Sequence, residues 1–276
     1  MKKVKLYYYR REPNFGDEFS LYLARKMQLE VEISSYEKCD TIFIGSVLEG
    51  FLRKKIWLTR DAWWLGLFRQ KVIVWGAGFI QDSCADEKLF RRLDVRACRG
   101  LSTLGRLRKL RGVKVAENVV IADPGLLVGR FIDTSQVKKK YELGVIPHYL
   151  HKADPLLSNI KVKNTTVIDI QQSPEAFMRV LAQCKNIISS SLHGLIAADS
   201  LGIPNVRMTL VNELLGGHYK FDDYYTAFEL DSHTIIDLTR REFTDADLPS
   251  IKNGYKITAQ QVTQLQSALI DSFPYK

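Results

Sequence analysis

The sequence has few cysteines and no long apolar run. Its four cysteines, Cys39, Cys84, Cys98 and Cys184, are scattered over 276 residues, without the density of a disulfide-stapled domain or the spacing of a paired redox motif. We therefore expect reduced thiols in a cytoplasmic protein. No stretch approaches the roughly 18–20 apolar residues of a membrane-spanning helix, and the short apolar run near the first residue leads into charges instead of a signal-peptide cleavage site.

Common nucleotide and metal motifs are also missing. The sequence has no P-loop and no HExxH motif, and its histidines, at 148, 151, 193, 218 and 233, are not at metal-ligand spacing. We therefore expect neither a metal nor a bound cofactor. The segment Trp75-Gly76-Ala77-Gly78 holds two glycines of a dinucleotide-binding fingerprint but lacks the third, so it also fits a tight turn after a strand.

The basic charge is concentrated in one part of the chain. The protein has 40 Lys and Arg against 31 Asp and Glu, a net charge of +9. Residues 51–115 hold 16 of these cations and five acids, a net charge of +11, and the rest is net −2. This asymmetry indicates a polyanionic partner: nucleic acid, an anionic membrane surface or a phosphorylated substrate. Without a nucleic-acid-binding motif, a non-enzymatic nucleic-acid binder is the least favoured of these.

Three of the four tryptophans lie close together within this basic region. Trp57, Trp63 and Trp64 are flanked by Arg and Lys, a combination that suits contact with a membrane interface. A sugar-binding platform and a core or interdomain helix remain alternatives, and packing is the commoner use of such residues.

Short apolar runs alternate with helical patterns along both halves of the chain. The runs that predict strands are residues 4–9, 41–45, 71–76, 94–97, 119–121, 142–147, 165–170 and 186–189. The patterns that predict helices are residues 16–28, 101–111, 174–183, 193–201 and 257–273. Such alternation favours an α/β protein with two largely parallel sheets. A polar segment near 130–141 divides it into domains 1–135 and 136–276.

The run Ser189-Ser190-Ser191 lies between a predicted strand and a predicted helix. Serine hydroxyls and the N–H groups of a helix start can bind an anion, and His193 in the first turn can serve as an acid, a base or a phosphate donor. The alternative is that the serines only cap the helix and that His193 is structural.

Two basic residues have the same double interpretation. Arg99 precedes a glycine at the end of a predicted strand, where its planar guanidinium can clamp a carboxylate or a phosphate. Lys220 stands among aromatic and acidic residues. Each can instead be an ordinary surface cation.

An ordered set of short motifs resembles the polysaccharide pyruvyl transferase family. The set is Asn14-Phe15-Gly16-Asp17, Gly45-Ser46, Trp75-Gly76-Ala77-Gly78, Arg99-Gly100, Asp123-Pro124, Ile146-Pro147-His148-Tyr149, Ser189-Ser190-Ser191-Leu192-His193-Gly194 and Gly202-Ile203-Pro204. The match spans about residues 4 to 225. Each motif is weak alone, and their order and spacing make the set specific.

The resemblance implies two Rossmann-like domains in a glycosyltransferase-B-like arrangement. It implies transfer of a pyruvyl group from phosphoenolpyruvate onto two hydroxyls of a sugar, forming a cyclic ketal in bacterial capsular or exopolysaccharide biosynthesis. The first domain would face the sugar acceptor and the second the donor, with the C-terminal helix packed back on the first. The acceptor would be a lipid-linked oligosaccharide, met at the inner face of the cell membrane.

By this resemblance, His193 matches a histidine that contacts phosphoenolpyruvate and acts in catalysis, and Arg99 matches a donor-binding arginine. Many family members carry another arginine two residues before the histidine, where this chain has Ser191. Either the serine run and the helix start suffice, or Lys220 or Arg207 compensates.

We expect Asp17 to be the base for the acceptor hydroxyl. The further substrate-binding candidates are Ser189, Ser190, Gly194, Asn14, Gly16, Gly76, Gly78, His148 and Lys220. The alternative function is a nucleotide-sugar-dependent glycosyltransferase, whose diphosphate the serine run would serve equally well.

Overall fold

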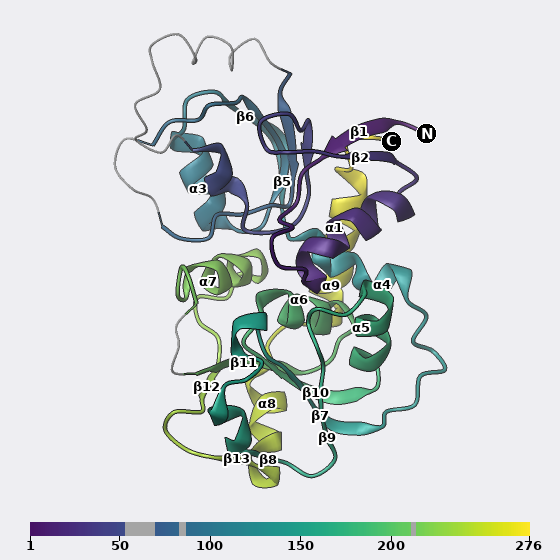
Figure 1. The fold of residues 1–276 in the computed structure, drawn as a ribbon, viewed down its shortest axis with the longest axis vertical. Coiled ribbons are helices and arrows are strands. Elements are labelled where there is room, and N and C mark those ends of the chain that lie inside the picture. Colours follow the sequence, from purple (N-terminus) through teal and green to yellow (C-terminus); the bar gives the residue numbers. More distant parts are fainter. Residues whose placement is uncertain (53–69, 83–86, 211–213) are drawn as a thin grey trace.

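The computed structural model describes residues 1–52, 70–82, 87–210 and 214–276 (Figure 1). Within these residues the chain forms two large parallel sheets. The first has the order β2-β1-β3-β4-β5-β6; its strands are β1 (Lys3–Leu6), β2 (Glu30–Ile33), β3 (Thr41–Ile42), β4 (Val72–Trp75), β5 (Leu93–Cys98) and β6 (Val113–Ile121). Every pairing in it is parallel.

The second sheet has the order β12-β11-β10-β7-β9, again with parallel pairings throughout. Its strands are β7 (Tyr141–Ile146), β9 (Thr165–Val167), β10 (Cys184–Ser189), β11 (Asn205–Thr209) and β12 (Ile235–Asp237). A small parallel pair, β8 (Ile160–Lys161) with β13 (Phe243–Thr244), flanks it. The predicted α/β class with two parallel sheets is confirmed. The boundary between domains 1–135 and 136–276 stays a prediction.

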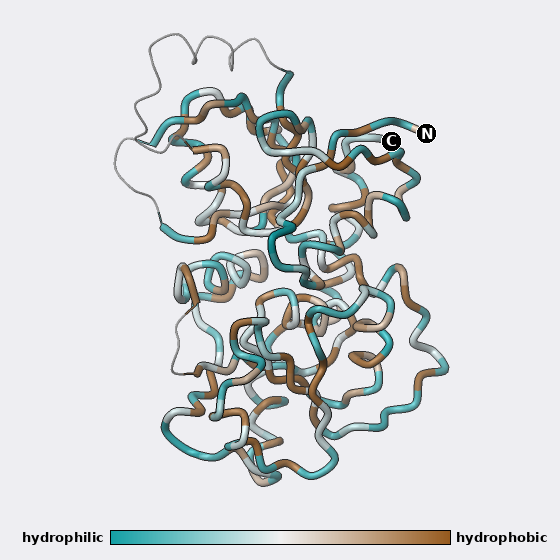
Figure 2. The backbone as a smooth tube through the Cα atoms, viewed as in Figure 1, coloured by the Kyte–Doolittle hydropathy of each residue, from teal (hydrophilic) through white to brown (hydrophobic). Residues whose placement is uncertain are grey.

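Helices cover both sheets. They are α1 (Phe15–Lys26), α3 (Leu101–Lys109), α4 (Val128–Phe131), α5 (Pro174–Leu181), α6 (Leu192–Ser200), α7 (Tyr219–Tyr225), α8 (Leu248–Gly254) and α9 (Ala259–Asp271). Figure 2 shows hydrophobic residues gathered inside each lobe and hydrophilic residues along the outer loops. None of the helices described has the length and apolar character needed to cross a bilayer.

Local sequence signals place several of these helices. The Asn14 side chain accepts the Asp17 N–H at 3.2 Å and so begins α1. Ser173 caps α5 in the same way and is followed by Pro174 in the first turn. Asn and Ser are residue types that favour this position, so the sequence itself begins both helices.

The last helix joins the two halves. Helix α9 follows the second sheet in the chain, yet its C-terminal end packs against the first. The Trp75 indole N–H donates to the Ser272 hydroxyl at 3.1 Å, and the rings of Trp75 and Phe273 lie 5.0 Å apart. Figure 1 shows α9 running up into the lobe that contains β1, with the two chain ends close together.

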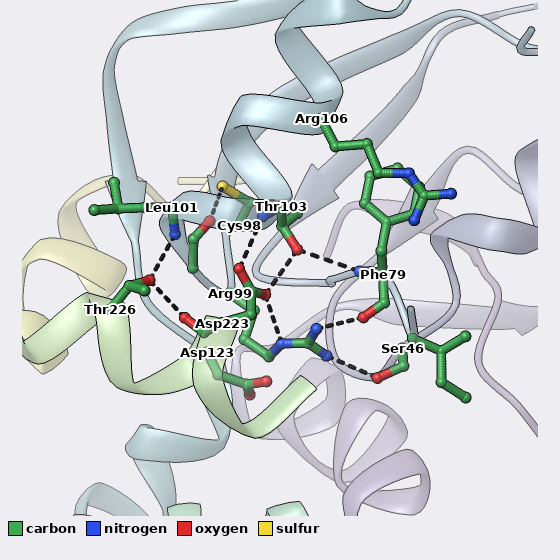
Figure 3. A network of polar contacts seen from close by, with 12 residues as sticks. Ser46, Phe79, Cys98, Arg99, Leu101, Thr103, Arg106, Asp123, Asp223 and Thr226 are labelled. Atoms are coloured by element: carbon green, nitrogen blue, oxygen red, sulfur yellow. Dashed lines mark hydrogen bonds and ion pairs between the residues drawn. The ribbon is translucent and has the colours of Figure 1, made fainter. Parts of the chain in front are cut away.

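A buried ion pair makes a second connection between the halves (Figure 3). The Arg99 Nε–H donates to Asp223 Oδ2 at 2.9 Å, and both side chains are almost fully buried. Arg99 also donates to the Ser46 hydroxyl at 2.7 Å and to the carbonyl of Phe79. Asp223 accepts the Thr103 N–H at 2.8 Å and its hydroxyl at 2.7 Å. Since Asp223 belongs to α7 and Thr103 to α3, the pair fixes α7 against the first half.

Loss of one partner should therefore destabilise the whole protein. Asp223→Ala leaves the buried Arg99 guanidinium without its counter-ion, and we expect the free energy of unfolding to fall by about 3–5 kcal/mol. Chemical denaturation followed by fluorescence measures this change. Asp271→Ala removes an exposed partner of Lys276 and should leave the unfolding midpoint nearly unchanged. Equal effects of the two variants would contradict this assignment.

Candidate functional site

The sheet topology places one crevice in each half. In the first sheet β1 lies between β2 and β3, and in the second β7 lies between β9 and β10. After each of these strands, the chain adds one strand on one side of it and then another on the opposite side. This change of direction leaves a crevice at the carboxyl ends of the strands. Open α/β sheets bind ligands at such positions.

The two crevices open into one cavity of about 330 Å³ between the halves. Tyr7 and Tyr9 after β1, with Ser46 after β3, line it from the first half. His148 after β7 and Ser191 after β10 line it from the second half. A ligand in this cavity would contact both sheets.

Asp17 lies in the first turn of α1 and faces this cavity. Its Oδ2 accepts the Asn14 amide N–H at 2.5 Å. Gly45 has a φ of +108°, and a Cβ on it would lie 2.9 Å from Asp17 Oδ1, so the glycine makes room for the carboxylate. Burial raises the pKa of Asp17 to about 6, against the lowering effects of His193 and of the Asn14 hydrogen bond. A carboxyl group with this pKa can exchange a proton near neutral pH.

His193 lies in the first turn of α6 and faces the same cavity. Its ring packs against the backbone of Gly16, where an added Cβ would approach Nδ1 to 2.0 Å. On the other side, His193 Nε2 lies 3.7 Å from Asp123 Oδ2, and that carboxylate is buried. A protonated His193 therefore has a counter-ion at hand. Asp17 and His193 interact electrostatically, so the cavity brings the two predicted catalytic residues together.

Lys220 supplies a buried cation to the cavity. It comes from α7, and only 8% of it is exposed. Burial, together with the nearby charges of Arg99 and Arg207, lowers the pKa of Lys220 to about 8. An ammonium group buried this far gains most from an anion beside it.

His148 presents a different kind of group. Its Nδ1 accepts the Leu150 N–H at 3.3 Å, so in the neutral ring the proton is on Nε2. Burial, together with the charge of Lys220, lowers the pKa of His148 to about 3. His148 is therefore a neutral hydrogen-bond donor at physiological pH. The sequence analysis predicted only that His148 binds substrate, without specifying how.

The serine run divides between this cavity and the protein interior. Ser191 lines the cavity, and its side chain does not cap α6. The Ser189 hydroxyl is buried and donates to the carbonyl of Ile146 at 2.9 Å. The Ser190 hydroxyl accepts the His148 N–H at 2.9 Å and contacts His151. Of the three serines, only Ser191 lines this cavity, together with the N-terminus of α6.

Several predicted substrate-binding residues lie against protein groups instead of lining the cavity. A Cβ on Gly76 would lie 1.9 Å from the Pro124 ring, and one on Gly78 would lie 2.5 Å from Arg99 Cζ. A Cβ on Gly194 would lie 2.5 Å from Ser189 Oγ. Arg99 itself is fully buried behind Ser46, to which it donates. The structure thus gives these residues packing and positioning contacts.

Sequence reasoning did not single out some residues that the structure brings to the site. Asp123 stood only in the Asp123-Pro124 motif, and its nearness to His193 comes from the fold. Tyr7, Tyr9 and Tyr149 line the cavity; Tyr149 stood only in the motif that ends with it, and the position of all three within three residues of the ends of β1 and β7 was the signal that could have found them.

Some predictions have no counterpart among these residues. The cluster Trp57, Trp63 and Trp64 lies outside the described part of the chain. In that described part, no three His, Cys, Asp or Glu side chains are grouped as a metal ion requires.

These features define an α/β protein with two parallel sheets and a cavity between them that holds a carboxyl group, two histidines and a buried lysine. The sequence profile of the family described as "Polysaccharide pyruvyl transferase" matches residues 1–210. This is more than half of the chain, and the chain therefore belongs to the polysaccharide pyruvyl transferase family. The resemblance drawn from the motifs is confirmed, and with it the assignment to the pyruvyltransferases of polysaccharide biosynthesis.

Two relatives illustrate how far the similarity extends. The chain is 27% identical over 289 residues to "Uncharacterized protein L143" of Acanthamoeba polyphaga mimivirus, covering 98% of this chain and 92% of that protein. It is 24% identical over 223 residues to "Succinoglycan biosynthesis protein ExoV" of Rhizobium meliloti (strain 1021). That match covers 80% of this chain and 64% of ExoV, so the chain spans less than two thirds of the latter's length.

The state of His148 can be tested directly. With its pKa lowered to about 3, His148 should remain neutral with a proton on Nε2 between about pH 5 and 8, the range in which an ordinary histidine titrates. Long-range ¹H–¹⁵N correlation spectra measure this, and His148→Gln assigns the signal. Titration of that signal within this range would contradict the burial argument.

Proposed function

We propose that this protein transfers the pyruvyl group of phosphoenolpyruvate onto two hydroxyls of a glycan sugar and so forms a cyclic ketal. The observation that carries this proposal is the convergence of Asp17, His193 and Lys220 on one cavity between the two sheets. An acid, a base and a buried cation are the groups that this reaction requires.

Phosphoenolpyruvate carries a phosphate and a carboxylate. The Lys220 ammonium and the N-terminus of α6 are the positive groups that the cavity offers to them, with the Ser191 hydroxyl as a further donor. Lys220 thereby replaces the arginine that many family members carry two residues before the histidine. The Nε2–H of His148 adds a neutral donor.

The reaction balances with these groups. A proton from the His193 imidazolium adds to the donor's methylene carbon, which becomes a methyl group, and the first sugar hydroxyl attacks the adjacent carbon. The bond from that carbon to the phosphate oxygen breaks, phosphate leaves, and the second hydroxyl closes the ketal. Of the two hydroxyl protons, one replaces the proton that His193 gave and the other leaves with phosphate. Asp17 accepts one of these hydroxyl protons and passes it to the departing phosphate, and Asp123 stabilises charged His193.

The acceptor in this proposal is a lipid-linked oligosaccharide of capsular or exopolysaccharide biosynthesis, met on the cytoplasmic face of the membrane. Exposed cations of the first half support this placement, since they would favour an anionic lipid surface. They are Arg92, Arg108, Lys109, Arg111 and Lys114.

The reaction class can be tested by mass spectrometry. Incubation with phosphoenolpyruvate and candidate lipid-linked oligosaccharides should add one pyruvyl ketal to an acceptor and release phosphate. His193→Ala should lower turnover by about 10²-fold or more, because it removes the proton donor. Lys152→Ala, an exposed cation outside the cavity, is the control and should react at the wild-type rate. Transfer of a sugar instead of a pyruvyl group would refute the proposal.

The pH dependence gives a second test. Asp17 must lose its proton to act as a base, so kcat/KM for phosphoenolpyruvate should rise with pH through the pKa of about 6. Lys220 must keep its proton, so kcat/KM should fall above its pKa of about 8. Lys220→Arg should lessen the loss of kcat/KM at alkaline pH, because a guanidinium stays charged. A profile without these limbs would assign the proton transfers to other groups.

A further inference from the structure

A second cavity lies beside the first and is not used by the reaction described above. It has a volume of about 730 Å³ and opens at the carboxyl ends of β10, β11 and β12. Two arginines and two histidines line it, together with two threonines and one carboxylate: Arg207, Arg240, His151, His218, Thr209, Thr239 and Asp237. Guanidinium, imidazole and hydroxyl groups together are typical of sites that bind phosphoryl groups.

Arg207 is the best-fixed of these groups. It lies on β11, is 7% exposed, and its Nη1 is 2.9 Å from His218 Nδ1. Its Cζ lies 3.8 Å from the centre of the Phe221 ring, a cation–π distance. These contacts hold the planar guanidinium in place before a ligand arrives, which reduces the entropy lost on binding. Arg240, by contrast, is exposed and lies with Asp237 at the rim.

The two cavities are neighbours in space. Lys220, which lines the first cavity, places its Nζ 5.4 Å from the centre of the Phe221 ring. Arg207, which lines the second, contacts the same ring. The consecutive residues Ser190 and Ser191 line the second and the first cavity, respectively. Ligands bound in the two cavities would therefore lie next to each other.

We infer that the second cavity binds the phosphate or diphosphate group through which the glycan acceptor is linked to its carrier. The statement that this phosphate or diphosphate belongs to the glycan acceptor rests on the proposed function. With phosphoenolpyruvate in the first cavity, the sugar hydroxyls must reach the donor from a neighbouring position, and a phosphoryl group held by Arg207 would place them there. His218 and the two threonine hydroxyls complete the contacts, and Arg240 attracts the anion at the rim.

The carrier of the diphosphate can be a nucleoside or a prenyl chain. The cavity wall includes apolar side chains, Met208, Leu210 and Ile235, which can pack against either. The shared chemistry is the diphosphate, and the two carriers are separated by experiment.

Isothermal titration calorimetry on the full chain tests this site. Inorganic pyrophosphate, UDP and geranyl diphosphate are titrated with and without saturating phosphoenolpyruvate. We expect pyrophosphate to bind in both conditions, because the two anions occupy different cavities. Tighter binding of UDP than of pyrophosphate identifies a nucleotide carrier, and tighter binding of geranyl diphosphate identifies a lipid carrier. Failure of all three to bind, or competition between pyrophosphate and phosphoenolpyruvate, overturns the inference.

Variants locate the binding. Arg207→Met should weaken pyrophosphate binding about tenfold or more, the effect of losing a charge-assisted contact, while Arg207→Lys should retain part of it. Because Arg207 is buried, Arg240→Met provides a variant at the exposed rim and should weaken binding by a smaller factor. Lys185→Met is the control, because Lys185 is an exposed cation at the amino end of β10 and lines neither cavity. Unchanged affinity in both arginine variants overturns the inference.

The same variants separate this inference from the proposed function. If pyruvyl transfer occurs and the affinity for pyrophosphate is the same with and without Arg207, only the second site is refuted. If pyrophosphate binding depends on Arg207 and no ketal forms with any acceptor, the site stands and the proposed reaction is refuted.

Discussion

The buried ion pair between Arg99 and Asp223 holds the helix on which the cavity depends. Asp223 is one of four residues of α7 with separate tasks: Lys220 lines the first cavity, Phe221 supports Arg207 in the second, and Tyr224 donates to Asp199 at 2.8 Å. Helix α7 has seven residues and too few internal hydrogen bonds to be stable alone. Its position therefore depends on tertiary contacts from both halves, and the first half contributes Arg99 and Thr103, which bind Asp223. Lys220 therefore belongs to the second half in sequence, and contacts with the first half help to hold it in place.

Close backbone approach is the second condition for the site. Asp17 and His193 come from helices in different halves, and each lies against a glycine: Asp17 over Gly45 and His193 over Gly16. A methyl group at either glycine would overlap the functional side chain. The two helices can thus bring a carboxylate and an imidazole into one cavity only because the facing residues are glycines, which have no side chain. This explains the glycines in the motifs without requiring them to contact a ligand.

Much of the fold could be predicted from sequence because its signals are local. The caps Asn14 and Ser173 and the apolar runs of β4 and β10 each depend on a few neighbouring residues. Helix α7 was missed, because its faces are occupied by aromatic and charged residues that are buried by partners far away in the chain. Strand β2 was missed because it is a mostly exposed edge strand with alternating glutamates. In each case, the missing information lies in tertiary contacts.

The same distinction applies to the site. His193 and Asp17 could be proposed from their places beside a predicted helix start and a strand end. The neutral state of His148 and the burial of Lys220 depend on which groups surround them, and no local pattern encodes that. Arg99 shows the limit most clearly, since its place at a strand end suits a ligand clamp. In the structure, its guanidinium donates hydrogen bonds to Asp223, to Ser46 and to the Phe79 carbonyl.

The packing of α9 on the first sheet has a consequence for how the chain folds during synthesis. Trp75 and Phe43 surround Phe273 in the first half, so part of that core must wait for a segment that the ribosome makes nearly two hundred residues after Trp75. Until α9 emerges, the first sheet exposes apolar surface that a chaperone or another chain can bind. The first half is therefore the earliest part to be made and among the last to be completed.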